Sequence, residues 1–191
     1  MTSPQSRTSA ATACLIEENR LTLAQLGELV ASLAPDAYRQ AFGEHGRHTL
    51  GKHVRHIIDH YDALFDGLAR GAAVIDYEQR QRDEALELWP QEAARRLGQI
   101  KKRLAALAGA PTVGALTLGY PTDDEALALP SSLNRELAFL TSHSIHHMAI
   151  IALLAEQAAL HLPASFGVHP STLRHWQRAT AEPAAPSRRR A

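Results

Sequence analysis

Residues 132–161 read SLNRELAFLTSHSIHHMAIIALLAEQAALH, and this stretch decides the fold. Its apolar side chains recur at the three- and four-residue steps of an α-helix, so that one face is apolar. The residues expected on that inner face are Leu133, Leu137, Leu140, Ile151 and Leu154. Ser132 is a suitable N-cap, and Pro163 ends the helix. One long helix with an apolar stripe needs other elements to bury that stripe, and the rest of the chain supplies them.

Three further segments show helical periodicity. The first runs from about residue 11 to 34, the second from a Thr49 cap to about residue 70, and the third begins at Trp89-Pro90. Residues 112–130 lie between the third and fourth helices and predict a small hairpin or irregular segment. We therefore predict an all-α protein, a four-helix bundle.

The predicted domain organisation is a single bundle with two tails. Residues 11–176 form the helical domain, whereas residues 1–10 and 177–191 are expected to be disordered. Acidic and basic residues balance at 20 each, so the body lacks the basic excess of nucleic-acid-binding domains. The single cysteine, Cys14, suits a reducing compartment. We expect a cytoplasmic protein with neither nucleic acid nor membrane as a partner.

Histidine is the unusual component of the sequence, with 11 residues that cluster in two segments. On the fourth helix, His143 and His147 are four residues apart, so their rings project from the same face. On the second helix, His53, His56 and His60 follow the flank of the apolar stripe. Any of these three is a candidate third imidazole for the pair on the fourth helix.

Three imidazoles and an open position are the arrangement of a catalytic metal site. Imidazole suits several metals, so the ligand set leaves Zn, Ni and Fe as candidates. The zincin proteases carry a glutamate after the first histidine of the pair, where this chain has Ser144, which disfavours that class. Two other interpretations stay open, namely buried histidines with satisfied hydrogen bonds and a proton-sensitive patch.

Two segments resemble the DinB-like superfamily, a group of four-helix-bundle proteins related to the bacillithiol and mycothiol transferases. The first is TLGKHVRHI, residues 49–57, at the start of the second helix. The second runs from Arg135-Glu136-Leu137 through SHSIHH, residues 142–147, on the fourth helix. The likeness extends over about residues 11–162. It implies an up-down-down-up bundle that is often a homodimer.

The resemblance also implies a metal site and a class of chemistry. The ligands it implies are His56, His143 and His147, with His53 or His60 as an alternative to His56. The implied function is that of a divalent-metal-dependent enzyme acting on a small molecule, with a low-molecular-weight thiol as cosubstrate of a transferase. A metal-dependent hydrolase and a non-catalytic metal-binding dimer are the alternatives.

Acid–base catalysis at such a site needs a further ionisable group. Asp59, Asp62 and Glu136 are the candidates, because they lie near the histidines along the two helices. The sequence does not show in which direction their side chains point. Glu136 also suits a structural role, because an acid in the first turn of a helix interacts favourably with the helix dipole. The sequence therefore names metal ligands and leaves the catalytic residues open.

Overall fold

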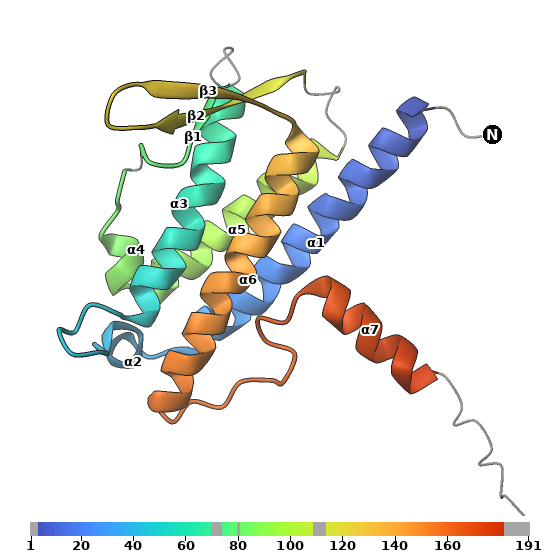
Figure 1. Ribbon diagram of the computed structural model, residues 1–191. Helices are drawn as coiled ribbons and strands as arrows, with labels where there is room; N and C mark the ends of the chain where they lie inside the picture. Colours follow the sequence, from blue (N-terminus) through green and yellow to red (C-terminus); the bar gives the residue numbers. More distant parts are fainter. Residues whose placement is uncertain (1–3, 70–73, 80, 109–113, 182–191) are drawn as a thin grey trace, which may run out of the picture.

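The computed structural model describes residues 4–69, 74–79, 81–108 and 114–181. Within these residues the chain forms seven helices and three short strands (Figure 1). In chain order they are α1 (Pro4–Ser32), α2 (Pro35–Arg39), α3 (Leu50–Ala69), β1 (Val74–Asp76), α4 (Ala85–Leu88), α5 (Pro90–Leu107), β2 (Leu116–Pro121), β3 (Ala126–Ser131), α6 (Leu133–Gln157) and α7 (Pro170–Ala181). The four long helices predicted from periodicity are α1, α3, α5 and α6.

These four helices pack around one apolar core. α1 lies against α5 and α6, and α3 lies against the same two helices from the other side. α3 and α5 both run toward the small sheet, whereas α1 and α6 run away from it (Figure 1). Side chains from all four helices are fully buried between them, among them Leu23, Leu64, Leu97 and Leu140. The histidine-bearing segments of α3 and α6 are therefore brought side by side by the core.

Local signals explain where several helices begin. The Thr49 hydroxyl accepts a hydrogen bond from the Lys52 amide at 3.0 Å, and Ser132 caps Arg135 in the same way at 3.3 Å. Pro90 occupies the first position of α5, where its missing N–H costs nothing. α1 begins at Pro4, earlier than periodicity predicted, and α7 extends past residue 176.

A three-stranded sheet closes one end of the bundle, so the all-α prediction is wrong in this respect. β2 and β3 form the expected antiparallel hairpin, with residues 112 and 113 of the predicted segment outside the described residues. β1, which follows α3, pairs in parallel with β2, and Val74 lies opposite Thr117. β1 was not predicted, because a strand of three residues is too short to show a period. The sheet lies beside the end of α3 and the start of α6 (Figure 1).

Two glycines let the connection between α3 and α5 pack directly on α3. A Cβ at Gly51 would lie 2.1 Å from the carbonyl oxygen of Glu87 in α4, and one at Gly67 would lie 2.8 Å from the carbonyl oxygen of Val74 in β1. Arg55 on α3 forms an ion pair with Glu87 in α4. It forms a second ion pair with Asp59 on its own helix, with 2.9 Å between the nitrogen and the oxygen. The connection is thus fixed to the same helix that carries three histidines.

The core also contains a buried polar network. Asn19 on α1 donates hydrogen bonds to the carbonyl oxygens of Leu15 and Leu137, at 2.8 and 3.0 Å. The Tyr61 hydroxyl of α3 donates to the Asn19 side-chain oxygen at 2.6 Å and lies 3.4 Å from the Ser144 hydroxyl of α6. Each buried group has a partner, and the network joins three helices in one register.

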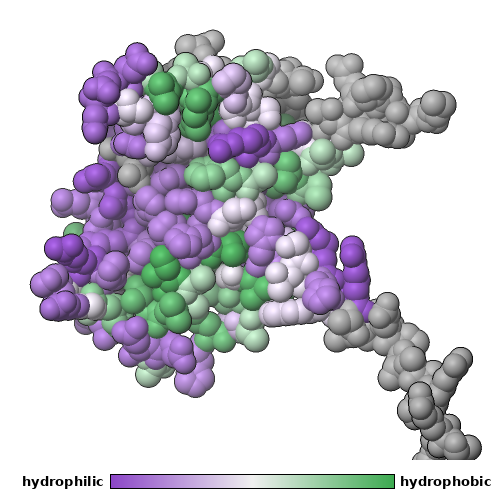
Figure 2. All heavy atoms as spheres, in the orientation of Figure 1, coloured by the Kyte–Doolittle hydropathy of each residue, from purple (hydrophilic) through white to green (hydrophobic). Residues whose placement is uncertain are grey.

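α6 is long and apolar enough to cross a membrane by length and composition. Core helices of bundles meet the same criterion, and α6 packs against α1 and α3 through buried leucines and isoleucines. Figure 2 shows that the face formed by α3 and α6 is largely hydrophilic across its middle, with apolar side chains below.

Candidate metal centre

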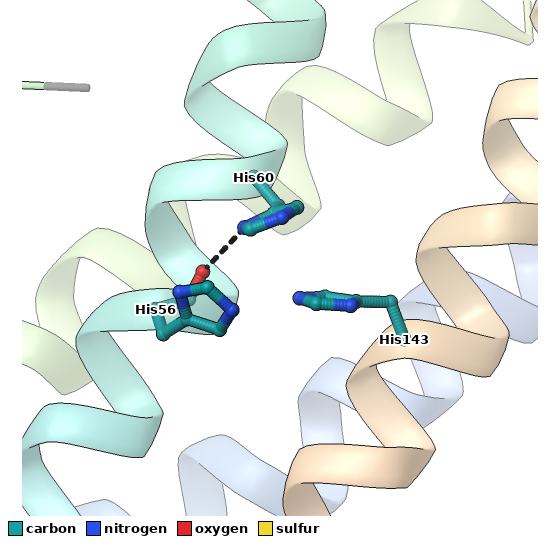
Figure 3. Close-up of side chains that lie close together, drawn as sticks. All are labelled: His56, His60 and His143. Carbon is teal, nitrogen blue, oxygen red and sulfur yellow. Dashed lines mark hydrogen bonds between the residues drawn. The ribbon is translucent and has the colours of Figure 1, made fainter. Parts of the chain in front are cut away.

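The structure gathers the histidines of α3 and α6 into one cluster. Nitrogen atoms of His56, His60 and His143 all lie within 4.8 Å of one another, and Figure 3 shows the two rings of α3 facing that of α6. His60 is buried, whereas His56 and His143 are half-buried. Two of the three ligands predicted from the resemblance, His56 and His143, thus belong to the group of three whose nitrogens converge.

The hydrogen bond of His60 decides which of its nitrogens faces a ligand. His60 Nδ1 lies 2.9 Å from the backbone carbonyl oxygen of His56 (Figure 3). A carbonyl oxygen only accepts, so Nδ1 carries the proton, and in the neutral ring Nε2 carries the lone pair. Metal-binding histidines are commonly oriented by such a bond from the second ring nitrogen. His60 therefore has the tautomer of a ligand.

His147, the third predicted ligand, lies at the edge of this group. Its ring centre is 4.4 Å from that of His56 and 4.6 Å from that of His143. Its Nδ1 is 3.1 Å from Nδ1 of His53, one turn earlier on α3 than His56. His146, on the other side of α6, is exposed. The structure thus brings all five candidate histidines of the two helices together.

Burial keeps two of these imidazoles in the neutral form. The pKa of His147 is lowered to about 3, first by burial and then by repulsion from His143, His53 and His146. The pKa of His53 is lowered by burial and by the nearby His48 and His146. A neutral imidazole is the form that binds a metal ion, so protons compete weakly for these two rings.

An aromatic wall covers the cluster on the side of the sheet. The Tyr77 ring, just after β1, stacks on His60 at 5.2 Å between ring centres. Phe139 lies 5.4 Å from His143 and 5.1 Å from Tyr77. The Tyr77 hydroxyl donates to Glu136 at 2.7 Å, and burial raises the pKa of this tyrosine. Nothing in the sequence indicates this wall, because Tyr77 and its partner Glu136 lie 59 residues apart in the chain.

The three carboxylates named as acid–base candidates are all engaged by other groups. Glu136 is fully buried and accepts hydrogen bonds from Tyr77, Ser131 and Arg135. Asp59 pairs with Arg55 at 2.9 Å, and Asp62 pairs with Arg96 at the same distance. Burial raises the pKa of Asp62, whereas Arg96 opposes that shift. Each carboxylate therefore has a structural role in the packing around the cluster.

The donor set fits a divalent transition metal. Three nitrogens bound to one zinc ion at about 2.0–2.1 Å lie roughly 3.3 Å apart, and the nitrogens of these rings lie within 4.8 Å of one another, so small side-chain rotations would bring them to one ion. Hard cations such as Mg²⁺ and Ca²⁺ prefer oxygen ligands, which this group of three does not offer. The imidazoles project from two neighbouring antiparallel helices, α3 and α6. The fold and the site therefore define the class of protein: a helical bundle with a candidate metal centre in its interior.

The comparisons give the family within that class. The DinB superfamily matches residues 18–151, about seven-tenths of the chain, and the protein belongs to this superfamily. The matched range includes α3, α5 and most of α6, and therefore all five histidines of the cluster.

Two individual proteins are similar to the chain. YfiT from Bacillus subtilis, described as a probable metal-dependent hydrolase with an unusual four-helix bundle topology, aligns with a TM-score of 0.57 and 18% identity. The alignment covers 84% of this chain and 92% of that one, and it shows a shared fold. A protein named FK506-binding protein 5, from Rhizopus delemar, is 31% identical over 106 residues. The match takes in 53% of this chain and only 27% of that relative.

Proposed function

We propose that this protein is a divalent-metal-dependent enzyme whose centre activates a small nucleophile. The observation that carries the proposal is the convergence of His56, His60 and His143 to within 4.8 Å from two facing helices. His56 and His143 are the core of the ligand set. His60, with its tautomer fixed by the backbone, is our third ligand, and His147 is the alternative that the resemblance implies.

The metal would supply acidity, because coordination lowers the pKa of a bound thiol or water. We favour a low-molecular-weight thiol as the nucleophile and a transferase as the activity. Asp59, Asp62 and Glu136 are all engaged in ion pairs or hydrogen bonds, which leaves little general-base assistance from these groups. A thiol needs less assistance to ionise than water, since its ordinary pKa is about 8.5 and that of water is about 15.7.

The remaining residues would bind and orient. Tyr77 and Phe139 pack against the His60 and His143 rings and restrict their rotation. Glu136 holds the Tyr77 hydroxyl, so the ring of Tyr77 is oriented for stacking rather than for proton transfer. Apolar substrate groups would contact this aromatic wall, and the half-buried His56 would mark the side open to solvent.

Hydrolysis is the second candidate, favoured by the description of YfiT as a probable metal-dependent hydrolase. The same centre would then act on a bound water. A common test separates the two activities: conjugation of small thiols to an electrophilic aryl halide, and release of nitrophenol from ester and amide substrates. The cytoplasmic location and the homodimer that we expect are separate proposals, tested by fractionation and by light scattering.

Metal content is the first experiment, on protein purified without a histidine tag. We expect the ion to be lost from His56→Ala and His143→Ala, and retained in the control His161→Ala, whose side chain is exposed and distant in the chain. If His60→Ala loses the metal ion and His147→Ala retains it, His60 is the third ligand. If His147→Ala loses the ion and His60→Ala retains it, the third ligand is His147, as the resemblance implies. Wild-type protein that takes up neither Zn, Ni nor Fe contradicts the enzyme proposal and leaves a histidine-rich structural bundle.

A further inference from the structure

Arg135 extends the line of aromatic rings on α6 toward the sheet. Residues at four-residue steps lie on one face of a helix, and this face of α6 carries Arg135, Phe139, His143 and His147. The guanidinium carbon of Arg135 lies 5.2 Å from the centre of the Phe139 ring, which in turn lies 5.4 Å from the centre of the His143 ring. A cation, an aromatic ring and a candidate metal ligand therefore follow one another along the helix.

The Arg135 side chain is held in place and still has donors for a ligand. Its Nη1 donates a hydrogen bond to Oε1 of Glu136 at 2.8 Å, and its position over Phe139 adds a cation–π contact. A guanidinium has several N–H groups, of which the bond to Glu136 uses one, and the side chain is 53% exposed. Because these contacts already orient the side chain, less conformational entropy is lost when it binds a ligand.

The carboxylate of Glu136 lies out of reach of a ligand in solvent. It is fully buried and accepts hydrogen bonds from Tyr77 and Ser131 as well as from Arg135. The half-exposed guanidinium is the part of this pair that a ligand meets. The accessible charge at the sheet end of the aromatic wall is therefore positive.

The separation of Arg135 from the candidate metal centre sets the length of a ligand that contacts both. Arg135 and His143 are about two turns apart, which corresponds to about 12 Å along the helix axis. The half-buried rings of Phe139 and Tyr77 lie on this path, with 5.1 Å between their centres. A ligand that pairs with Arg135 and reaches the centre must therefore pass over the aromatic wall with an apolar segment.

We propose that Arg135 binds the carboxylate of an elongated substrate, whose apolar middle lies on the aromatic wall and whose reactive end lies at the metal centre. The inference rests on the proposed function, because that function places the reactive end at the histidines. A planar guanidinium matches a carboxylate through two parallel hydrogen bonds, which makes Arg135 a specificity-determining residue. The substrate class is an amphipathic organic acid whose carboxylate lies about 10 Å from the reacting atom.

The test measures the binding of matched probes to the protein loaded with Co²⁺. The probes are ω-sulfanyl alkanoates of increasing chain length and the corresponding carboxamides, whose sulfur changes the visible spectrum of bound Co²⁺. We expect wild type to bind the best-fitting acid about tenfold more tightly than its amide, because a hydrogen-bonded charge is lost in the amide. This preference should disappear in Arg135→Gln. The control is Arg95→Gln, which changes an exposed arginine of α5 and should keep the preference.

Two results overturn the proposal. They are equal affinities of wild type for the acids and their amides, and a preference for the acid that persists in Arg135→Gln. Thermal unfolding of both variants establishes that they are folded.

A second comparison separates this inference from the proposed function. If the protein takes up no metal, the proposed function fails, and phenylalkanoates and their amides replace the thiols, with NMR chemical-shift changes as the readout. These probes contact only the aromatic wall and Arg135. A preference for the acid that is lost in Arg135→Gln then supports the carboxylate site, and equal binding of acid and amide overturns it.

Discussion

Replacing Gly51 by alanine should destabilise the bundle, although alanine is the better helix former. The added Cβ would lie 2.1 Å from the Glu87 carbonyl oxygen and 2.9 Å from the Tyr38 ring. Non-bonded carbon and oxygen atoms need about 3.3 Å, so α4 must move by about 1 Å relative to α3. Overpacking destabilises a protein by about 1–3 kcal/mol. Because the obstacle here is a backbone carbonyl oxygen, we expect a value at the upper end of this range. The higher helix propensity of alanine offsets at most about 1 kcal/mol of it. The net expectation is a loss of about 2 kcal/mol.

Thermal unfolding followed by circular dichroism measures this loss. For a chain of this size, 2 kcal/mol lowers Tm by about 4–8 °C. Gly98→Ala is the matched control, because Gly98 lies within α5 and an added Cβ meets no atom within 4 Å. That variant should raise Tm by about 1–4 °C. If Gly51→Ala is as stable as Gly98→Ala, the close approach of α4 to α3 is refuted, and with it our account of how the connection is fixed.

Three further substitutions test the buried polar groups, each by urea denaturation. Glu136→Ala leaves the donors that surround a fully buried carboxylate without their acceptor, and should cost about 2–3 kcal/mol. Asn19→Ala removes the acceptor of the buried Tyr61 hydroxyl and should cost a similar amount, whereas an unchanged midpoint would contradict the network described for the core. Arg55→Met separates a buried carboxylate on the same helix from its cation and should cost about 3 kcal/mol. Arg95→Met, in an exposed pair, should change stability by less than about 1 kcal/mol.

Periodicity and caps predicted the long helices well, because these signals are local. The Ser132 cap, the proline at the start of α5 and the inner face of α6 are all confirmed. Asn19 interrupts the apolar seam of α1, and the structure supplies Tyr61 and Leu137 as its hydrogen-bond partners. Cys14 lies on an exposed part of α1, although a free cysteine is usually a buried residue.

The histidine cluster could be predicted, but the division of its members could not. His53, His56 and His60 are spaced by three and four residues, so all three lie on one flank of α3. Which rings converge depends on the rotation of α3 against α6, and that rotation is set by packing in the whole core. The tautomer of His60 depends on a backbone hydrogen bond within the helix, which side-chain spacing does not reveal.

The parallel pairing of β1 with β2 has a consequence for the order of folding. Val74 and Thr117 are partners, although α4 and α5 lie between them in the chain, so their pairing requires α5 to have folded back first. Long-range contacts of this kind form late, and substitutions in them speed unfolding more than they slow folding. Tyr77 follows β1 directly and covers His60. The aromatic cover of His60 therefore depends on the same long-range pairing of β1 with β2.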